Sequence, residues 1–121
     1  MEFDNNKSIF LQIADSISEK VASGTLAAGE KIPSVRELAS EMGVNPNTIM
    51  RTYNELQSMN IIENKRGIGY FVNSDAQQII LNSKRQEFFE KVLPEFIRNA
   101  EILGISATEI KSHLDTLRNG S

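Results

Sequence analysis

The feature that most constrains this chain is a pair of helix boundaries that nearly touch. Gly43 suits the left-handed residue that closes a helix, and it follows an apolar periodic segment at about 34–42. Asn45 is a preferred N-cap, and Pro46 fits the first position of a second helix at about 46–59. Two short helices joined by so short a turn with a glycine are the sequence form of a helix-turn-helix.

The first of these helices also has a strong start signal. Ser34 and Glu37 have the spacing of a capping box, in which each residue's side chain accepts a hydrogen bond from the other's amide. Pro33 stops any upstream continuation of the helix. The apolar side chains predicted to face the core from the two helices are Val35, Leu38, Ala39, Met42, Ile49, Tyr53 and Leu56.

Elements on either side complete a winged helix. Upstream, apolar residues recur at steps of about four and predict a helix at about 8–23 with Ser8 as its N-cap, followed by a loop between two glycines. Downstream, residues 61–63 and 69–72 have strand-like composition, and Gly67 between them can supply the positive φ of a hairpin turn. A hairpin directly after the second helix of the pair is a wing.

The remainder of the chain is expected to be helical. A wide apolar stripe at helical spacing extends over 88–103, and Pro94 within it should kink or restart the helix just before the proline. A serine and a glutamate with capping-box spacing predict a last helix at about 106–118. We therefore predict a mainly α fold with a small β-hairpin. An N-terminal winged helix-turn-helix, residues 1–74, is followed by a short α-helical dimerisation tail of two helices, residues 75–121.

Composition excludes several classes of protein. Hydrophobic residues make up 40% of the chain, which is enough for a modest core and too much for a disordered chain. The sequence has no cysteine, so disulfides, thiolate metal sites and cysteine nucleophiles are excluded. No apolar run approaches the roughly 18 residues of a membrane span, and the first four residues lack the pattern of a secretory signal. We therefore expect a cytoplasmic protein without a membrane partner.

Net charge, taken alone, argues against nucleic-acid binding. The chain carries a formal net charge of −3. The distribution of charge is more informative, because residues 31–72 carry five basic and four acidic side chains and are the only third with a positive balance. A strongly basic face is the usual electrostatic footprint of DNA binding. The prediction of a DNA-binding surface therefore depends on where single cations lie.

The outward side of the second helix carries residue types that can read DNA. In a helix-turn-helix this helix enters the major groove, and Asn, Thr and Arg side chains can hydrogen-bond to base edges there. For Met50 two interpretations stay open, packing or contact with a thymine methyl group. Asn45 is expected mainly to cap the second helix, and contact with a phosphate is a further possible role. The positions left outward by the predicted core are Asn47, Thr48, Met50, Arg51 and Asn54.

Cations outside this helix would complete the contact with DNA. Arg36 could reach the backbone from the preceding helix, and Lys65 and Arg66 at the hairpin tip could enter or flank the minor groove. Gly67 and Gly69 have no side chain and would let the hairpin backbone approach the DNA closely. Each cation also has a structural interpretation, as a partner of acidic neighbours or as an ordinary turn charge. The predicted DNA-binding residues are Ser34, Arg36, Asn45, Asn47, Thr48, Arg51, Lys65, Arg66, Gly67 and Gly69.

Three motifs in order carry a resemblance to a known family. Pro-Ser-Val-Arg-Glu-Leu-Ala at 33–39, Gly-Val-Asn-Pro-Asn-Thr-Ile-Met-Arg-Thr-Tyr at 43–53 and Gly-Ile-Gly-Tyr-Phe-Val at 67–72 resemble the GntR family of bacterial regulators. The resemblance extends over 8–72 and implies a winged helix-turn-helix that dimerises and binds short palindromic operators in double-stranded DNA. The Asn-Pro-Asn-Thr and Arg-Thr-Tyr details, with a short tail, are most similar to the YtrA subfamily, whose members are typically repressors, often of neighbouring transporter genes.

The chain departs from the family pattern at two positions. Many family members carry arginines where this sequence has Pro46 and Met50. Arg51 lies one place later and is the candidate substitute for that pair of DNA contacts. The base preference of relatives with the other pattern therefore does not transfer to this chain.

The apolar stripe of the tail predicts pairing with a second copy. A tail of about 45 residues is too thin to bury so wide a stripe by itself, and a two-fold homodimer would cover it. A small apolar effector between two tails is the open alternative, and the sequence does not say what that molecule is. The predicted dimer contacts are Phe88, Phe89, Val92, Phe96, Ile97, Leu103, Ile110 and Leu114.

No chemistry beyond binding is predicted. His113 is the only histidine, and a lone histidine without cysteines makes a poor metal site. No Ser/His/Asp grouping is discernible, so we predict no catalytic residue, no metal and no cofactor. One other hypothesis stays open, a protein-interaction adaptor built on a winged helix. A piece of an enzyme, such as the aminotransferase-like fusions of some relatives, is not expected, because 121 residues leave no room for that fold.

Overall fold

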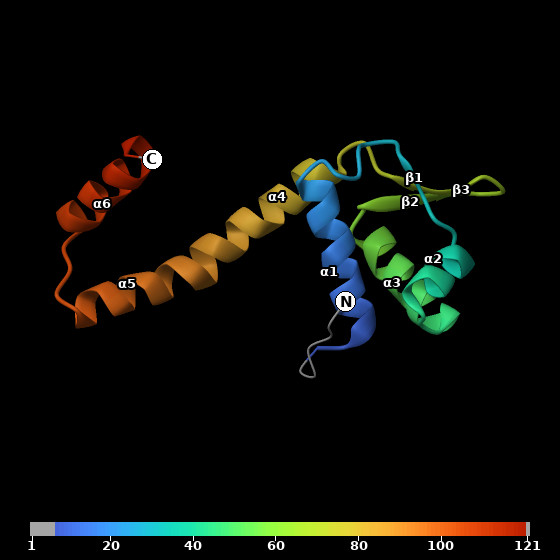
Figure 1. The fold of residues 1–121 in the computed structure, drawn as a ribbon, viewed down its shortest axis with the longest axis horizontal. Helices are drawn as coiled ribbons and strands as arrows, with labels where there is room; N and C mark the ends of the chain where they lie inside the picture. The colour runs from blue at the N-terminus through green and yellow to red at the C-terminus, as the bar shows by residue number, and fades with distance from the viewer. Residues whose placement is uncertain (1–6, 121) are drawn as a thin grey trace. The chain divides into compact units, whose positions relative to one another are not determined.

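The computed structural model describes residues 7–120. Contacts between residues divide the chain after Ser83 into two units (Figure 1). We call the described parts of these units the head, residues 7–83, and the tail, residues 84–120. No helix within the described residues is long and apolar enough to cross a bilayer.

The head combines three helices with a small sheet, which confirms the predicted winged helix-turn-helix. The helix at the N-terminal side begins after Ser8, whose side chain lies at the N-cap position but accepts no hydrogen bond. In chain order the elements are α1 (Ile9–Ala22), β1 (Lys31–Ile32), α2 (Val35–Met42), α3 (Pro46–Ser58), β2 (Ile62–Lys65), β3 (Gly69–Val72) and the first turns of α4 (Ala76–Glu87).

The turn of the helix-turn-helix forms as its capping signals predict. The Ser34 hydroxyl accepts from the Glu37 amide at 3.1 Å, and the Glu37 carboxylate accepts from the Ser34 amide at 3.0 Å. Gly43 closes α2 in the left-handed conformation, with φ of 67°. Asn45 starts α3, because its side-chain oxygen accepts from the Asn47 amide at 2.8 Å.

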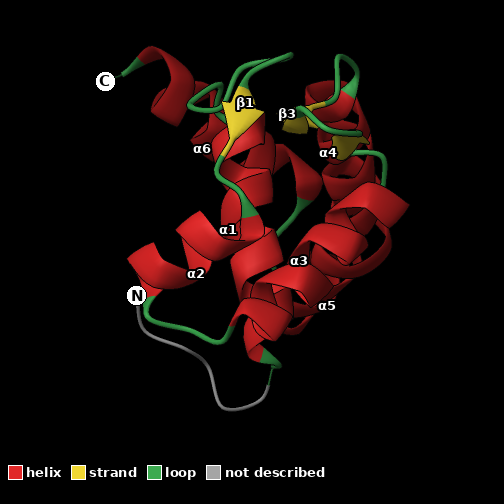
Figure 2. Ribbon diagram, turned by 90° about the vertical axis from the view of Figure 1, so that its right-hand side faces the viewer, coloured by secondary structure: helices red, strands yellow, loops and turns green. Residues whose placement is uncertain are grey.

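The sheet has three antiparallel strands in the order β1-β3-β2, coloured yellow in Figure 2. β2 and β3 are the predicted hairpin, with Lys65 opposite Gly69 beside the turn. β1 was not predicted, and its pairing with β3 places Lys31 opposite Phe71. A strand of two residues shows no alternation of apolar and polar side chains, so only its partner reveals it.

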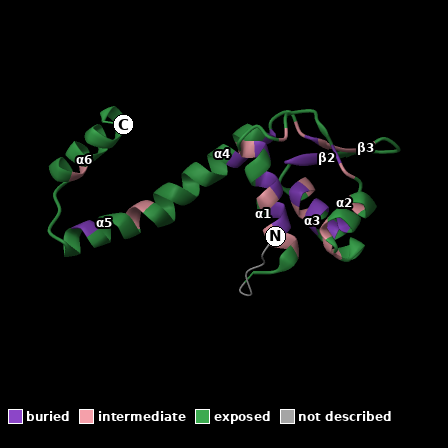
Figure 3. Cartoon of the chain, viewed as in Figure 1, coloured by how far each residue is buried: buried purple, intermediate pink, exposed green. Residues whose placement is uncertain are grey.

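The head closes a hydrophobic core of its own. Ile49, Tyr53 and Leu56 of α3 are fully buried, in agreement with the sequence prediction. Burying a large apolar side chain contributes roughly 1.5–3 kcal/mol, so a core of this size stabilises the head without a partner. Figure 3 shows the buried residues in purple on α1, α3 and the strands. The other core residues are Ile13, Ala14, Ile17, Val21, Ile32, Ala39, Ile61, Ile62, Val72, Ala76 and Ile80.

The first turns of α4 belong to the head. Ala76 and Ile80 are buried in its core, and the Gln77 side chain donates to the Ala22 carbonyl at 2.9 Å. The sequence pattern predicts a boundary after residue 74, and the contacts between residues divide the chain after Ser83. Two apolar contacts one turn apart attach a helix to a core, but they are too few to give a sequence pattern.

The tail is helical throughout its length, except for a short connection before α6. Of the kink or restart expected at Pro94, the structure shows no break: the five residues before Leu93 form a π-helical turn, and the backbone continues directly into α5. Of the capping box expected near residue 106, the described residues show one half, in which the Ser106 hydroxyl accepts from the Glu109 amide at 3.1 Å. After the end of α4, the elements are η1 (Phe88–Val92), α5 (Leu93–Ile102) and α6 (Ala107–Asn119).

Candidate nucleic-acid interface

α3 presents a polar face opposite its buried one. Asn47, Arg51 and Asn54 are exposed, and their spacing of four and three residues places them on one side of the helix. Met50 beside them is 42% exposed, which favours contact with a partner over packing in the core. Thr48 is half-buried, so its side chain is the least accessible of the predicted base-reading set.

The position of α3 is fixed by one buried tyrosine. The Tyr53 hydroxyl donates to the Pro33 carbonyl at 2.7 Å, directly before the start of α2. Its ring meets Tyr70 of β3 edge-on, with 4.8 Å between the ring centroids. Burial raises the pKa of Tyr53 well above its ordinary range, so the hydroxyl stays protonated and the link persists at neutral pH. One residue therefore ties the candidate recognition helix both to α2 and to the wing.

Arg51 is the only cation of α3, all of whose residues are described. Its guanidinium carbon lies 4.2 Å from the centroid of the Phe10 ring of α1. Within residues 7–120, Arg51 forms no ion pair. The five N–H donors of the guanidinium are therefore available to an acceptor outside the chain.

The first turn of α2 carries a second exposed cation. Arg36 forms no ion pair within residues 7–120, so the interpretation as a partner of acidic neighbours gains no support. Ser34 is engaged in its own helix through its amide, its hydroxyl and its carbonyl, so its role as a DNA contact stays a prediction. The Ser34 amide, which donates to the Glu37 carboxylate, and the Ser34 side chain lower the pKa of Glu37, which keeps the cap ionised at neutral pH.

Asn45 combines a structural role with an accessible donor. Its side-chain oxygen caps α3, and the residue is exposed. Within the described part of the chain, the side-chain amide nitrogen has no hydrogen-bond partner. A cap whose NH₂ group points to solvent at a helix N-terminus suits a phosphate oxygen.

The wing presents two neighbouring cations, Lys65 and Arg66, directly before its turn glycine. Gly67 has φ of 80°, which confirms the turn residue predicted from sequence. The Lys65 ammonium lies 4.6 Å from the centroid of the Phe71 ring and 3.8 Å from the Glu63 carboxylate. Arg66 is exposed and forms no ion pair within residues 7–120. The tip of the hairpin thus offers one free and one weakly paired cation.

Lys31 is a third cation near the wing, and it is not among the DNA-binding residues predicted from the sequence. Lys31 of β1 and Lys65 of β2 flank Phe71 of β3 from opposite sides. Gly69 has φ of 139°, and a Cβ added there would lie 2.9 Å from the Lys31 side chain. The glycine thus makes room for this lysine. No local signal marks Lys31, because only the pairing of strands distant in sequence brings it to the wing.

The tail exposes the apolar stripe that the sequence predicts as a dimer contact. In the single chain Ala100 is the only buried residue among those described in the tail. A groove of about 560 Å³ is lined by apolar side chains of η1, α5 and α6, with His113 as its single titratable neighbour. Ile110 is half-buried, and the exposed members of the predicted set are Phe88, Phe89, Val92, Phe96, Ile97, Leu103 and Leu114. No cluster of potential metal ligands occurs within residues 7–120.

Comparison with known sequences decides the family. The family model for bacterial regulatory proteins of the gntR family matches residues 10–72, which is more than half of the 121 residues. The matched segment contains the helix-turn-helix, both strands of the wing and every predicted DNA-binding residue. This chain belongs to the GntR family. It is therefore a DNA-binding transcriptional regulator and not an enzyme.

Individual relatives of this GntR regulator agree with that assignment. It is 37% identical to the HTH-type transcriptional regulator YhcF of Bacillus subtilis, over 98% of this chain and 97% of YhcF. It is 33% identical to the HTH-type transcriptional repressor YtrA of the same organism, over 84% of this chain and 78% of YtrA. A GntR-family regulator from Bacteroides thetaiotaomicron of known crystal structure is 39% identical, with a TM-score of 0.77 over 94% of this chain and 100% of that chain. Likeness to YtrA places the regulator in the YtrA subfamily.

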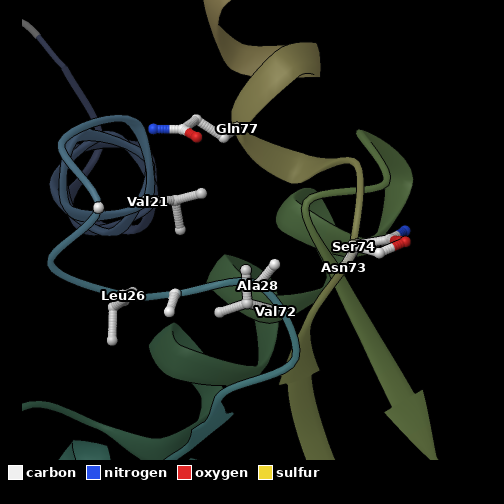
Figure 4. A pocket seen from close by; sticks show the side chains of 9 residues that line it. Val21, Leu26, Ala28, Val72, Asn73, Ser74 and Gln77 are labelled. Carbon is white, nitrogen blue, oxygen red and sulfur yellow. The ribbon is translucent and has the colours of Figure 1, made fainter.

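A small cavity beside the end of β3 has none of the predicted DNA-binding residues in its lining. It has a volume of about 210 Å³ and lies between the end of α1, the loop that follows it and the start of α4 (Figure 4). Val21, Leu26 and Val72 line it with apolar groups, and no titratable side chain contributes. Asn73, Ser74 and Gln77 supply only neutral polar groups, and we assign the cavity no role in this GntR head.

Proposed function

We propose that this GntR regulator is a homodimeric repressor that binds a palindromic operator in the cytoplasm. Helix α3 would enter the major groove, and the wing of residues 63–72 would lie along the adjacent minor groove. The observation that carries the proposal is the exposed face of Asn47, Arg51 and Asn54 on the second helix of a helix-turn-helix. Asn pairs bidentately with adenine and Arg with guanine, and each such pair contributes roughly 1–3 kcal/mol of discrimination.

Contacts to phosphates would supply most of the affinity. Arg36 on α2, Lys31 on β1, and Lys65 and Arg66 on the hairpin are exposed cations around this face. Neutralised phosphates release counterions, so binding should weaken steeply with salt. The overall charge of −3 makes these few cations more important, because no broad basic surface assists them.

Pairing of two chains through the tail would explain a palindromic target. The exposed stripe over 88–103, continued on α6, is too apolar to face water in a stable protein. A two-fold partner would cover it and would place two heads on half-sites about one helical turn apart. The groove of the tail leaves room for a small apolar effector, which we propose only as an open alternative for part of that surface.

Repression is the direction of regulation that the relatives favour. YtrA of Bacillus subtilis is named a transcriptional repressor. A dimer bound across an operator would block access of the transcription machinery to the promoter. A reporter gene placed behind the selected operator should therefore be expressed less when the protein is present, and higher expression would reverse the proposed sign of regulation.

Selection of bound duplexes from a random pool, at about 0.15 M salt, tests the DNA target. We expect enrichment of a two-fold site, and we expect Arg51→Ala and Lys65→Ala to weaken binding to it. Lys111→Ala is the matched control, because this lysine lies in the tail and pairs with Asp115 at 3.0 Å. Folded protein that binds no duplex would contradict the proposal and favour the adaptor hypothesis.

Sedimentation of two tail variants tests the dimer. Phe96→Arg places a charge in the predicted stripe, and we expect it to yield monomers that no longer prefer the palindrome. Ile102→Arg is the matched control on the same helix, because this side chain is 81% exposed and lies outside the predicted set. Wild-type protein that sediments as a monomer at micromolar concentration would contradict the dimer.

A further inference from the structure

We propose that Phe10 of α1 is a positioning residue for DNA recognition, which acts by holding the guanidinium of Arg51 against its ring. This inference rests on the proposed function and assigns a role to a residue outside the helix-turn-helix. Phe10 itself would touch neither bases nor phosphates. Its effect on the choice of operator would be exerted entirely through Arg51.

The geometry of the pair carries the proposal. The guanidinium carbon lies 4.2 Å from the ring centroid, well inside the range of about 6 Å over which a cation is attracted to an aromatic face. Phe10 is half-buried, so its ring packs partly against the head, and one face of the ring lies beside Arg51. Arg51 is itself exposed, and its outer face is open to an acceptor.

The backbone of Phe10 is anchored to α3 next to Arg51. Thr52 is fully buried, and its hydroxyl lies 3.2 Å from the Phe10 carbonyl and 2.8 Å from the Thr48 carbonyl. The hydroxyl thus links the two helices one residue after Arg51. The backbone that carries the ring is therefore tied to the recognition helix next to Arg51.

Holding the arginine matters because α3 has no second cation. Arg51 is the only cation of the fully described helix α3. A free arginine side chain loses much conformational freedom when it binds, and a guanidinium that is already held over a ring loses less. The attraction to the ring uses no N–H donor, so the donors of the guanidinium stay available for a base or a phosphate.

The wing contains a second cation over a ring, which provides a contrast. The Lys65 ammonium lies 4.6 Å from the Phe71 centroid but also 3.8 Å from the Glu63 carboxylate. An ammonium is a compact charge on a flexible stem and does not stack in a fixed plane. The ring at position 71 should therefore influence affinity weakly, whereas the ring at position 10 should influence which sequence is preferred.

The experiment compares full-length variants on the operator selected by the wild type. Phe10→Leu keeps an apolar side chain and removes the aromatic face, and Phe10→Tyr keeps the face. We expect Phe10→Leu to weaken binding about three- to tenfold and to flatten the base preference at the positions that Arg51→Ala also affects. Phe10→Tyr should retain both properties. Ile9→Ala, an exposed neighbour on the same turn of α1, is the control and should leave the preference unchanged.

A double-mutant cycle separates positioning from general loss of structure. In an Arg51→Ala background, Phe10→Leu should cause no further change in affinity or preference, provided that circular dichroism shows each variant folded at the assay temperature. Equal effects of Phe10→Leu with and without Arg51 would overturn the proposal. So would a wild-type preference profile in Phe10→Leu, or a flattened profile in Phe10→Tyr.

Failure of this inference is distinguishable from failure of the proposed function. If Arg51→Ala weakens operator binding while Phe10→Leu does not, the DNA interface stands and the positioning role is wrong. If the wild type selects no duplex, the proposed function fails and the inference fails with it.

Discussion

The head and the tail are similarly rich in apolar residues but bury them to very different extents. In the head, side chains of α1, α3, the sheet and α4 meet in one core, and Ile49, Tyr53 and Leu56 are fully buried. In the described tail, phenylalanines of the same apolar character remain about half exposed, and only Ala100 is buried. A periodic pattern therefore predicts which side of a helix is apolar, but it does not say whether the covering surface lies in the same chain.

The largest expected effect of this difference concerns isolated fragments. A fragment of residues 1–83 should unfold cooperatively at a temperature independent of protein concentration, because its core is complete. A fragment of residues 84–121 should be largely unfolded when dilute, since short helices without tertiary packing are marginal in water. Circular dichroism over a hundredfold range of concentration checks both. If the helicity of the tail fragment did not depend on its concentration, the tail would fold alone as the head does, and the two regions would not differ in this respect.

Leucine truncations in the two regions should differ next most strongly. Leu56 is 0% exposed, and Leu56→Ala should lower the free energy of unfolding of the head by about 2–5 kcal/mol. Leu114 is 52% exposed, so Leu114→Ala should change the unfolding of a single chain much less and should instead raise the dimer dissociation constant. Chemical denaturation and sedimentation separate the two effects. Similar losses of unfolding free energy would show that the tail has a core that the single chain does not reveal.

Helix caps give a smaller difference of the same kind. Ser34 forms a complete capping box with Glu37, and Ser34→Ala should destabilise the head by about 1 kcal/mol. Ser106 forms one half of the equivalent arrangement with Glu109, so Ser106→Ala should cost less. Thermal unfolding of the full chain measures both variants. A larger shift for Ser106→Ala would mean that α6 contributes more to the fold than its exposure suggests.

The pH dependence of the head should be the smallest effect. Hydrogen bonds from Ser34 lower the pKa of Glu37 from 4.5, so its stabilisation is present above that value and is lost as pH falls through the lower folded pKa. Burial raises the pKa of Tyr53 from 10.0, so the stabilisation by its neutral hydroxyl is present below that value and is lost as pH rises toward the folded pKa. Melting temperatures measured between pH 3 and 11 check the loss of stability at acid pH and the loss at alkaline pH. Glu37→Gln should remove part of the loss of stability at acid pH. It should alter the loss at alkaline pH only slightly, because the Glu37 charge is the smallest of the causes that raise the pKa of Tyr53.

Local signals account for what the sequence predicts well. The caps at Ser34 and Asn45, the left-handed Gly43 and the turn at Gly67 each act within a few residues, so the helix-turn-helix and the hairpin follow from them. Strand β1 and the docking of α4 depend on contacts between distant segments and were not predicted for that reason.

The candidate interface shows the same limit. Arg51 was identified from its position on the outward side of a helix, which is a local property. The ring of Phe10 beneath it and the lysine at position 31 near the wing are distant in sequence from the residues that they adjoin. Only the packing of α1 on α3 and the pairing of β1 with β3 reveal them.

The docking of α4 on the head also bears on the order of events while the protein is being made. Ala76 and Ile80 complete a core whose other residues all precede them in the chain. A nascent chain leaves the ribosome N-terminus first, and domains generally fold as units as they emerge. We therefore expect the head to be folded while the tail is still being synthesised, so that the exposed apolar stripe reaches solvent last. The time during which that stripe is free to associate with other nascent chains is then confined to the final stage of translation.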